Sequence, residues 1–214
     1  MGKALAIVHV DDSLLVLDKP AGLLAVPGRG PDKADCLAAR AQARFPDARV
    51  VHRLDMDTSG LMLMARGAAA QRALSSAFAM RTVRKRYLAV VAGRMKPPVE
   101  EWGSIDLPLI CDWPNRPRQI VDHAIGKPSL TRWRVLEHDA SHDATRVELE
   151  PVTGRSHQLR VHLAALGHPI LGDALYAQPV LQARAPRLLL HAWRLTFIHP
   201  VTREVLEFER PGPF

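Results

Sequence analysis

The chain has 214 residues, of which 47% are hydrophobic, enough for one large domain or two small ones with a proper core. It contains no run of eighteen apolar residues and no signal-peptide pattern, so we expect a cytoplasmic protein without a membrane-spanning helix. The 29 lysines and arginines against 22 acidic residues give a net charge of +7. Such an excess favours a polyanionic partner, and the clustering of the arginines favours nucleic acid. Cys36 and Cys111 are expected to be free thiols, and no zinc site is expected.

The first ninety residues are predicted to alternate short strands with two helices. In chain order we expect strands at 4–10 and 14–18, a loop at 27–31, a helix at 35–45, a strand at 61–65, a helix at 67–80 and a strand at 85–91. The first helix ends before Pro46, because proline cannot continue it. Leu74 and Phe78 lie four residues apart, so both should face the core from the second helix.

The segment from Met95 to Lys127 has little periodicity and is rich in proline, tryptophan and charge. A loop of this length is usually functional or disordered, so we expect a long surface excursion. Beyond it we expect strands at 131–136 and 146–150, a helix at 156–166, and strands at 186–191, 193–198 and 204–208. Ser156 is the expected N-cap of that helix, and Gly167 is expected to end it. Hairpin-like pairs mixed with a few helices indicate one α+β domain over 1–214, with a mixed, largely antiparallel sheet.

The segment 52–61, HRLDMDTSGL, is the densest polar cluster and directly precedes the apolar strand at 61–65. Asp55 is its candidate functional residue. An Asp in this position is often only a turn former or a cap. However, a neighbouring cation such as Arg53 favours the ionised carboxylate, which could serve as a nucleophile or base. Asp57 could form a carboxylate pair with Asp55 as in a glycosidase, but a solvated turn-capping Asp57 is the simpler interpretation. An aspartic-protease loop is disfavoured, because no second copy supplies the partner.

A second cluster, GRSHQLRVH at 154–162, places cations at the start of a predicted helix. Free N–H groups at a helix start favour anions, so this segment is either an anion site or a basic solvated helix. His157 and Arg160 are three residues apart and should share a face, whereas His157 and His162 lack the spacing of paired zinc ligands. Tyr87 either packs in the core or stacks on a base from a basic cleft. The basic clusters are Arg81, Arg84, Lys85 and Arg86, and then Arg116 and Arg118.

Together these segments resemble the RluA family of RNA pseudouridine synthases. The matching motifs are KPAGL at 19–23, HRLDMDTSGL at 52–61, KRY at 85–87, GRSHQLRVH at 154–162, GHPILGD at 167–173 and LLLHA at 188–192. They follow one another in the family's order over nearly the whole chain. The resemblance implies that the protein isomerises uridine to pseudouridine in RNA without a metal or another cofactor. The competing hypothesis is a catalytically silent RNA-binding protein with the same fold.

The resemblance also assigns roles to individual residues. Asp55 would be the catalytic carboxylate, and Arg160 would pair with it and keep it ionised. Tyr87 would be a second catalytic residue, which stacks under the flipped uracil and helps to remove the C5 proton. Arg53 would enter the space that the flipped base leaves in the stack. Whether Asp55 attacks C1′, adds to the base or abstracts a ribose proton stays open, and further substrate contacts are expected from His52, Arg84, Arg86, Arg155 and Leu190.

The RNA partner is expected to be a stem-loop. The segment 107–117 resembles the loop of family members with dual specificity for 23S rRNA and tRNA, where the tRNA target is the anticodon loop. Many family members carry an N-terminal S4 RNA-binding domain, for which no residues are available here. We therefore expect RNA recognition to come from the Arg81–Arg86 cluster and from the excursion at 95–127.

Overall fold

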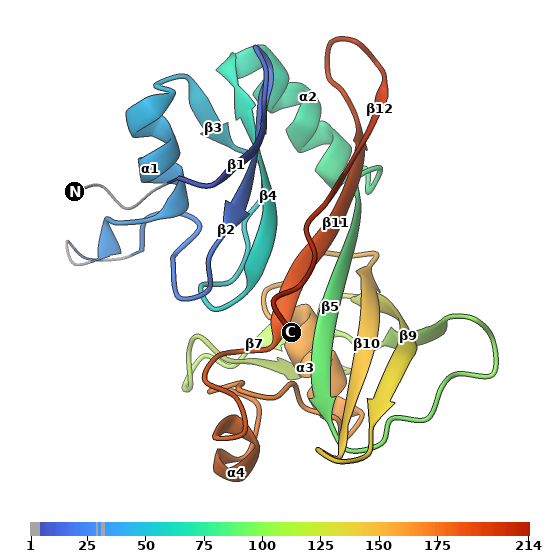
Figure 1. Cartoon of the computed structure of the whole chain (residues 1–214). Helices are drawn as coiled ribbons and strands as arrows, with labels where there is room; N and C mark the ends of the chain where they lie inside the picture. Colours follow the sequence, from blue (N-terminus) through green and yellow to red (C-terminus); the bar gives the residue numbers. More distant parts are fainter. Residues whose placement is uncertain (1–4, 29, 31–32) are drawn as a thin grey trace. The chain divides into compact units, whose positions relative to one another are not determined.

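The computed structural model describes residues 5–28, 30 and 33–214, and its contacts group the chain into two compact units (Figure 1). Unit 1 is formed by Met1–Lys85 and Ala192–Pro213, and unit 2 by Arg86–His191 with Phe214. Both combine antiparallel strands with helices, which confirms the predicted α+β class. No helix in the described part of the chain is long and apolar enough to cross a membrane.

Unit 1 is built around strand β4 (Ser59–Arg66), whose first seven residues are all buried. β4 pairs antiparallel with β2 (Leu14–Lys19) and β3 (Ala48–Val50), and β2 pairs antiparallel with β1 (Ile7–Val10). β11 (Leu190–Ile198) follows β4 in the strand order and pairs antiparallel with β12 (Val205–Glu209). The helices are α1 (Leu37–Arg44) and α2 (Gly67–Ala79). As predicted, Leu74 and Phe78 of α2 both join the core.

Gly60 lets β4 approach β11 closely. Its φ is +108°, and a Cβ added there would lie 2.8 Å from the amide nitrogen of Ala192 and still closer to that residue's carbonyl oxygen. Any side chain would have to displace the backbone of β11, and the positive φ already favours glycine. Gly60 is therefore required by packing.

Unit 2 contains the antiparallel order β5 (Arg84–Ala92), β10 (Ala144–Pro151), β9 (Leu130–Asp139) and β6 (Gly103–Asp106). A separate hairpin is formed by β7 (Leu109–Cys111) and β8 (Gln119–Val121). Two helices, α3 (Gln158–Ala165) and α4 (Pro179–Gln182), complete the unit. α3 contacts β8, β9 and β10, so the predicted arginine-bearing helix lies against the sheet and the hairpin.

Three expectations from the sequence are wrong. The excursion at 95–127 contains strands β6, β7 and β8, which are too short to show a period and form because they pair with partners. The two strands expected at 186–191 and 193–198 are one strand, β11, that begins at Leu190. Ser156 does not cap α3, because His157 is the N-cap and has no side-chain capping bond.

Other boundaries agree more closely. Gly167 follows the last turn of α3 with φ +82°, as expected for the residue that ends a helix. α1 begins at Leu37, and the Cys36 thiol accepts a hydrogen bond from the Ala39 amide. Cys36 is buried and Cys111 half-buried, and both are free. The expected start of the first strand at Ala4 and parts of the loop at 27–31 lie outside the described residues.

Candidate active site

The turn that carries Asp55 is held by a buried lysine. Lys19, at the end of β2, is fully buried, and its Nζ donates to the carbonyl oxygens of Pro20 (2.9 Å), Leu23 (2.6 Å) and Met56 (2.7 Å). The Met56 carbonyl also accepts from the Gly22 amide at 3.0 Å. The Lys19 ammonium group therefore joins the KPAGL segment to the Asp55 turn by hydrogen bonds to main-chain oxygens of both.

Within this turn the side chains differ in exposure. The Thr58 amide donates to the Asp55 carbonyl oxygen at 3.2 Å, which closes the turn just before β4. Leu54 and Thr58 are buried, Asp55 is half-buried and Arg53 is exposed. Asp55 thus lies on a short segment that is anchored on both sides, while Arg53 extends into solvent. This exposure is consistent with the predicted insertion of Arg53 into RNA, which stays a prediction.

His52 acts inside unit 1. Its Nε2 accepts the Leu63 amide of β4 at 2.9 Å, and its ring stacks on Phe78 of α2 with centroids 4.4 Å apart. Burial, with a smaller contribution from the nearby charge of Lys85, lowers the pKa of His52 to about 3. His52 is therefore a neutral acceptor that joins α2 to β4, and its predicted substrate contact stays a prediction.

Tyr87 and Arg86 are neighbours in β5 with different surroundings. Tyr87 lies opposite Leu149 of β10 and is only 9% exposed. Arg86 is half-buried and forms ion pairs with Glu148 (3.5 Å) and Glu150 (3.3 Å) of β10. Arg84 is exposed, and burial lowers the pKa of Lys85. Of this basic cluster, Arg84 and Arg81 are exposed, as RNA contacts must be, whereas Arg86 is neutralised within the protein.

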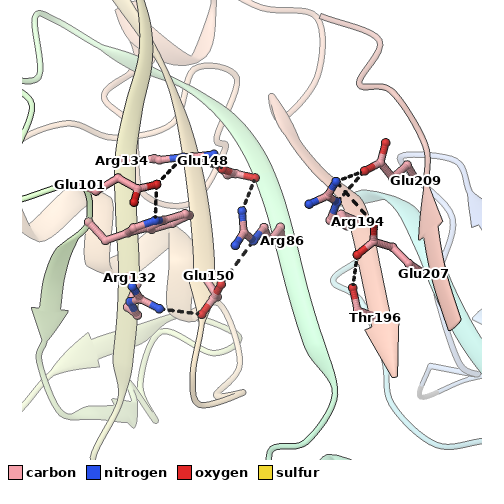
Figure 2. Close-up of polar contacts among 11 residues, drawn as sticks. Arg86, Glu101, Arg132, Arg134, Glu148, Glu150, Arg194, Thr196, Glu207 and Glu209 are labelled. Atoms are coloured by element: carbon pink, nitrogen blue, oxygen red, sulfur yellow. Dashed lines mark hydrogen bonds and ion pairs between the residues drawn. The ribbon is translucent and has the colours of Figure 1, made fainter. Parts of the chain in front are cut away.

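Figure 2 shows the network that engages Arg86. Glu148 is 1% exposed and accepts from Arg134 at 2.7 Å as well as from Arg86, and Arg132 pairs with Glu150 at 3.2 Å. The guanidinium carbons of all three arginines lie 4.7–5.2 Å from the centroid of the Trp102 ring. On this face of the sheet, the three arginines are thus paired with glutamates of the same unit and stacked on Trp102.

Arg160 of α3 forms a buried two-point ion pair. Its Nε and Nη2 donate to the two carboxylate oxygens of Asp173 at 2.8 and 2.6 Å, and the two residues are 3% and 0% exposed. The guanidinium carbon also lies 5.1 Å from the centroid of the Tyr176 ring. The orientation of this arginine is therefore set by a planar fork and an aromatic face.

The start of α3 is organised by Gln158. Its side-chain oxygen accepts from the Arg155 amide (3.0 Å) and the Thr153 hydroxyl (2.8 Å), and its amide donates to the Leu130 carbonyl and the Thr131 hydroxyl. His157 before it has φ +54°. This explains why Ser156 is not the cap: a glutamine two residues later already satisfies the entry to the helix. Arg155 is exposed, and Leu190, the first residue of β11, is buried.

Three residues with central contacts received no role from the sequence: Lys19, Asp173 and Tyr176. Lys19 and Asp173 lie inside the matching motifs, so their place in a motif is the sequence signal that could have singled them out. Tyr176 is one of only two tyrosines, three residues after Asp173. In the described part of the chain, no three His, Cys, Asp or Glu residues are grouped as a metal site requires.

Comparison with known proteins identifies the class. The family model of RNA pseudouridylate synthases matches residues 13–165. The chain is 50% identical over 210 residues to the dual-specificity RNA pseudouridine synthase RluA of Escherichia coli strain K12, covering 98% of this chain and 94% of that protein. The protein of the same name from Pasteurella multocida strain Pm70 is 49% identical over 210 residues, with the same coverage.

A solved structure agrees. The chain is similar to human RNA pseudouridylate synthase domain containing 1, with a TM-score of 0.79 and 34% identity over 99% of this chain and 84% of that one. The chain belongs to the RNA pseudouridylate synthase family. It is an enzyme that isomerises uridine to pseudouridine in RNA, which confirms the resemblance found in the sequence.

Proposed function

We propose that this enzyme modifies uridines in two RNA classes, the anticodon loop of tRNA and a stem-loop of 23S rRNA. The observation that carries this proposal is the 50% identity to a dual-specificity enzyme, which covers 98% of this chain and 94% of that protein. The resemblance of the loop at 107–117 to that of dual-specificity family members supports it, and this loop forms β7 and the turn of the β7–β8 hairpin, a separate two-stranded sheet in unit 2. We further propose that the chain acts as a single catalytic domain in the cytoplasm.

In the reaction that we propose, Asp55 is the catalytic carboxylate. The N1–C1′ bond of the target uridine breaks, the uracil turns, C5 bonds to C1′, and the proton leaves C5 while N1 regains one. No oxidant, reductant or hydrolytic water takes part. The main-chain anchoring of the Asp55 turn supports this role, because a reacting carboxylate must be held in position. Arg160 would serve as the cation that keeps Asp55 ionised.

The remaining predicted residues would hold the RNA. Tyr87 would stack under the flipped uracil, and Leu190 would line the pocket wall. Arg53 would fill the vacated stack, which offsets part of the few kcal/mol that base flipping costs. Arg84 and Arg155, both exposed, would contact phosphates. His52 and Arg86 would contribute further substrate contacts.

The proposal is tested by mapping pseudouridines in tRNA and 23S rRNA from cells that lack the gene. We expect one site to disappear from each RNA class and both to return when the gene is supplied on a plasmid. The purified enzyme should also release tritium from transcripts of both RNAs labelled at uracil C5. Loss of sites from only one class would contradict dual specificity while leaving the enzyme class intact.

A further inference from the structure

The tip of the β7–β8 hairpin presents an exposed aromatic side chain with a cation stacked on it. Trp113 is 66% exposed, and the guanidinium carbon of Arg116 lies 4.6 Å from the centroid of its ring. The turn is closed by main-chain bonds between Asp112 and Arg118 (3.0 Å) and between Asn115 and Asp112 (3.1 Å). An exposed tryptophan with an arginine stacked on one face is suited to stack an unpaired base on the other.

The hairpin is connected to α3 through Tyr176. The amide of Gln119, the first residue of β8, donates to the Tyr176 hydroxyl at 2.7 Å, and the same hydroxyl lies 2.7 Å from Nδ1 of His157. The Gln119 amide donates to the hydroxyl, and the direction of the second bond is set by the tautomer of His157. One hydroxyl therefore joins β8 to the N-cap of α3.

The ring of Tyr176 is part of the setting of Arg160. The guanidinium carbons of Arg160 and Arg118 lie 5.1 and 5.5 Å from its centroid. Asp173 completes the link: its Oδ1 accepts from Arg160 (2.6 Å) and from the amides of Leu175 (2.9 Å) and Tyr176 (3.1 Å). A shift of β8 must therefore either break the Gln119 bond or move the aromatic face against which Arg160 is oriented.

We propose that Tyr176 is a positioning residue that couples the docking of an RNA stem-loop on the hairpin tip to the orientation of Arg160. The proposal rests on the proposed function, because it takes Arg160 to act in the reaction and RNA to contact the excursion. RNA stacked on Trp113 fixes the hairpin, the Gln119 amide fixes the Tyr176 hydroxyl, and the ring holds the arginine in its reactive orientation. Contiguous contacts make such coupling physically possible, and only a double-mutant cycle establishes it.

The first test is Tyr176→Phe, which removes the hydroxyl and keeps the ring beside both arginines. With a tRNA anticodon stem-loop as substrate, we expect kcat to fall about tenfold, because Arg160 is less well oriented once the hydrogen bond from Gln119 is lost. We expect KM to stay within about twofold, because the RNA contacts remain. The matched control is Thr145→Val, which removes a buried hydroxyl that bonds Gly93 and Met95 at the other end of β10. It should lower Tm without changing kcat.

The second test is a cycle with Trp113→Ala. Alone, Trp113→Ala should raise the Kd for the stem-loop and lower kcat. In the Tyr176→Phe background it should raise Kd equally but lower kcat much less, because the connection is already broken. His157→Gly, which removes the imidazole that bonds the Tyr176 hydroxyl and suits a left-handed backbone, should reproduce the kcat loss if the Phe variant fails to fold.

Multiplicative kcat losses, an unchanged kcat in the Phe variant, or an unchanged Kd for Trp113→Ala each overturn the proposal. Asp55→Asn is assayed in parallel. Retained turnover in that variant shows that the proposed catalytic assignment has failed, which is distinct from a failure of the coupling.

Discussion

The Asp55 turn and helix α3 hold Asp55 and Arg160, the two side chains proposed to act together in the reaction, in different ways. In unit 1 the turn is held by main-chain oxygens gathered around the ammonium group of Lys19, so the identity of the residues in between matters little to the anchoring. In unit 2 the arginine is held by side chains, chiefly Asp173 and Tyr176. The first arrangement tolerates variation in the loop and fixes its path. The second fixes one guanidinium group and tolerates little substitution.

The largest effect is expected for Asp55→Asn. Because a neutral amide can be neither nucleophile nor base, turnover should fall by at least about a thousandfold, while Tm and RNA affinity stay near those of the parent. Tritium release from C5-labelled RNA measures the rate. Asp57→Asn, two residues along the same turn, is the matched control and should stay active. Near-parental turnover of Asp55→Asn would sink the assignment.

Asp173→Asn is expected to have the next largest effect. It replaces the charged partner in a buried two-point ion pair by a neutral amide, which costs about 3–5 kcal/mol of unfolding free energy. Glu209→Gln changes the carboxylate that pairs with the more exposed Arg194 and should cost less than about 1 kcal/mol. Urea denaturation of the two variants gives the comparison. Equal losses would show that burial does not distinguish the two pairs.

Lys19→Met tests the main-chain anchoring. The side chain keeps its apolar volume, but three carbonyl oxygens lose the ammonium group as a donor, so we expect a loss of about 3 kcal/mol of unfolding free energy. In the folded fraction kcat should fall as well, because the Asp55 turn loses the Lys19 bonds that tie it to residues 20–23 and keeps the bond from the Gly22 amide to the Met56 carbonyl. Lys127→Met replaces an exposed lysine and serves as the control. An unchanged kcat in folded Lys19→Met would mean that the turn holds its path without the lysine.

The smallest effect concerns pH. The native pKa of His52 is lowered to about 3, whereas an unfolded histidine titrates near 6.5. Below pH 6.5 the unfolded chain therefore binds a proton that the native state does not, and stability is lost as the pH falls from about 6.5 toward 3. Between pH 7 and 5 we expect this residue to cost about 2 kcal/mol of unfolding free energy. His52→Gln, which can still accept the Leu63 amide, should show a correspondingly flatter pH dependence of urea midpoints.

The sequence predicted the elements whose pattern is local. β2 and β4 have continuous apolar runs, and the β9–β10 pair alternates across a polar turn, so all four were expected close to their observed bounds. β6, β7 and β8 have only three or four residues and exist because they pair, which no window along the chain reveals. The entry to α3 was misassigned because Gln158 satisfies it through contacts to residues 27 and 28 positions away.

The same division applies to the site. Asp55, Tyr87 and Arg160 could be predicted as site residues because they stand in motifs with a fixed order. The function of Lys19 depends on a contact with Met56, 37 residues later, and on complete burial, neither of which a motif shows. Tyr176 is a similar case, since its partners Gln119 and His157 come from a hairpin and a helix start that the sequence did not join.

The requirement for a glycine at position 60 comes from packing and not from catalysis. The close approach of β4 to the Ala192 backbone forbids a side chain there whether or not the enzyme turns over. A descendant that had lost catalysis would be free to replace Asp55 while still being compelled to keep this glycine. In a comparison of paralogues the glycine therefore indicates a shared architecture, whereas the aspartate five residues before it would, in the catalytic role proposed here, indicate whether the enzyme is active.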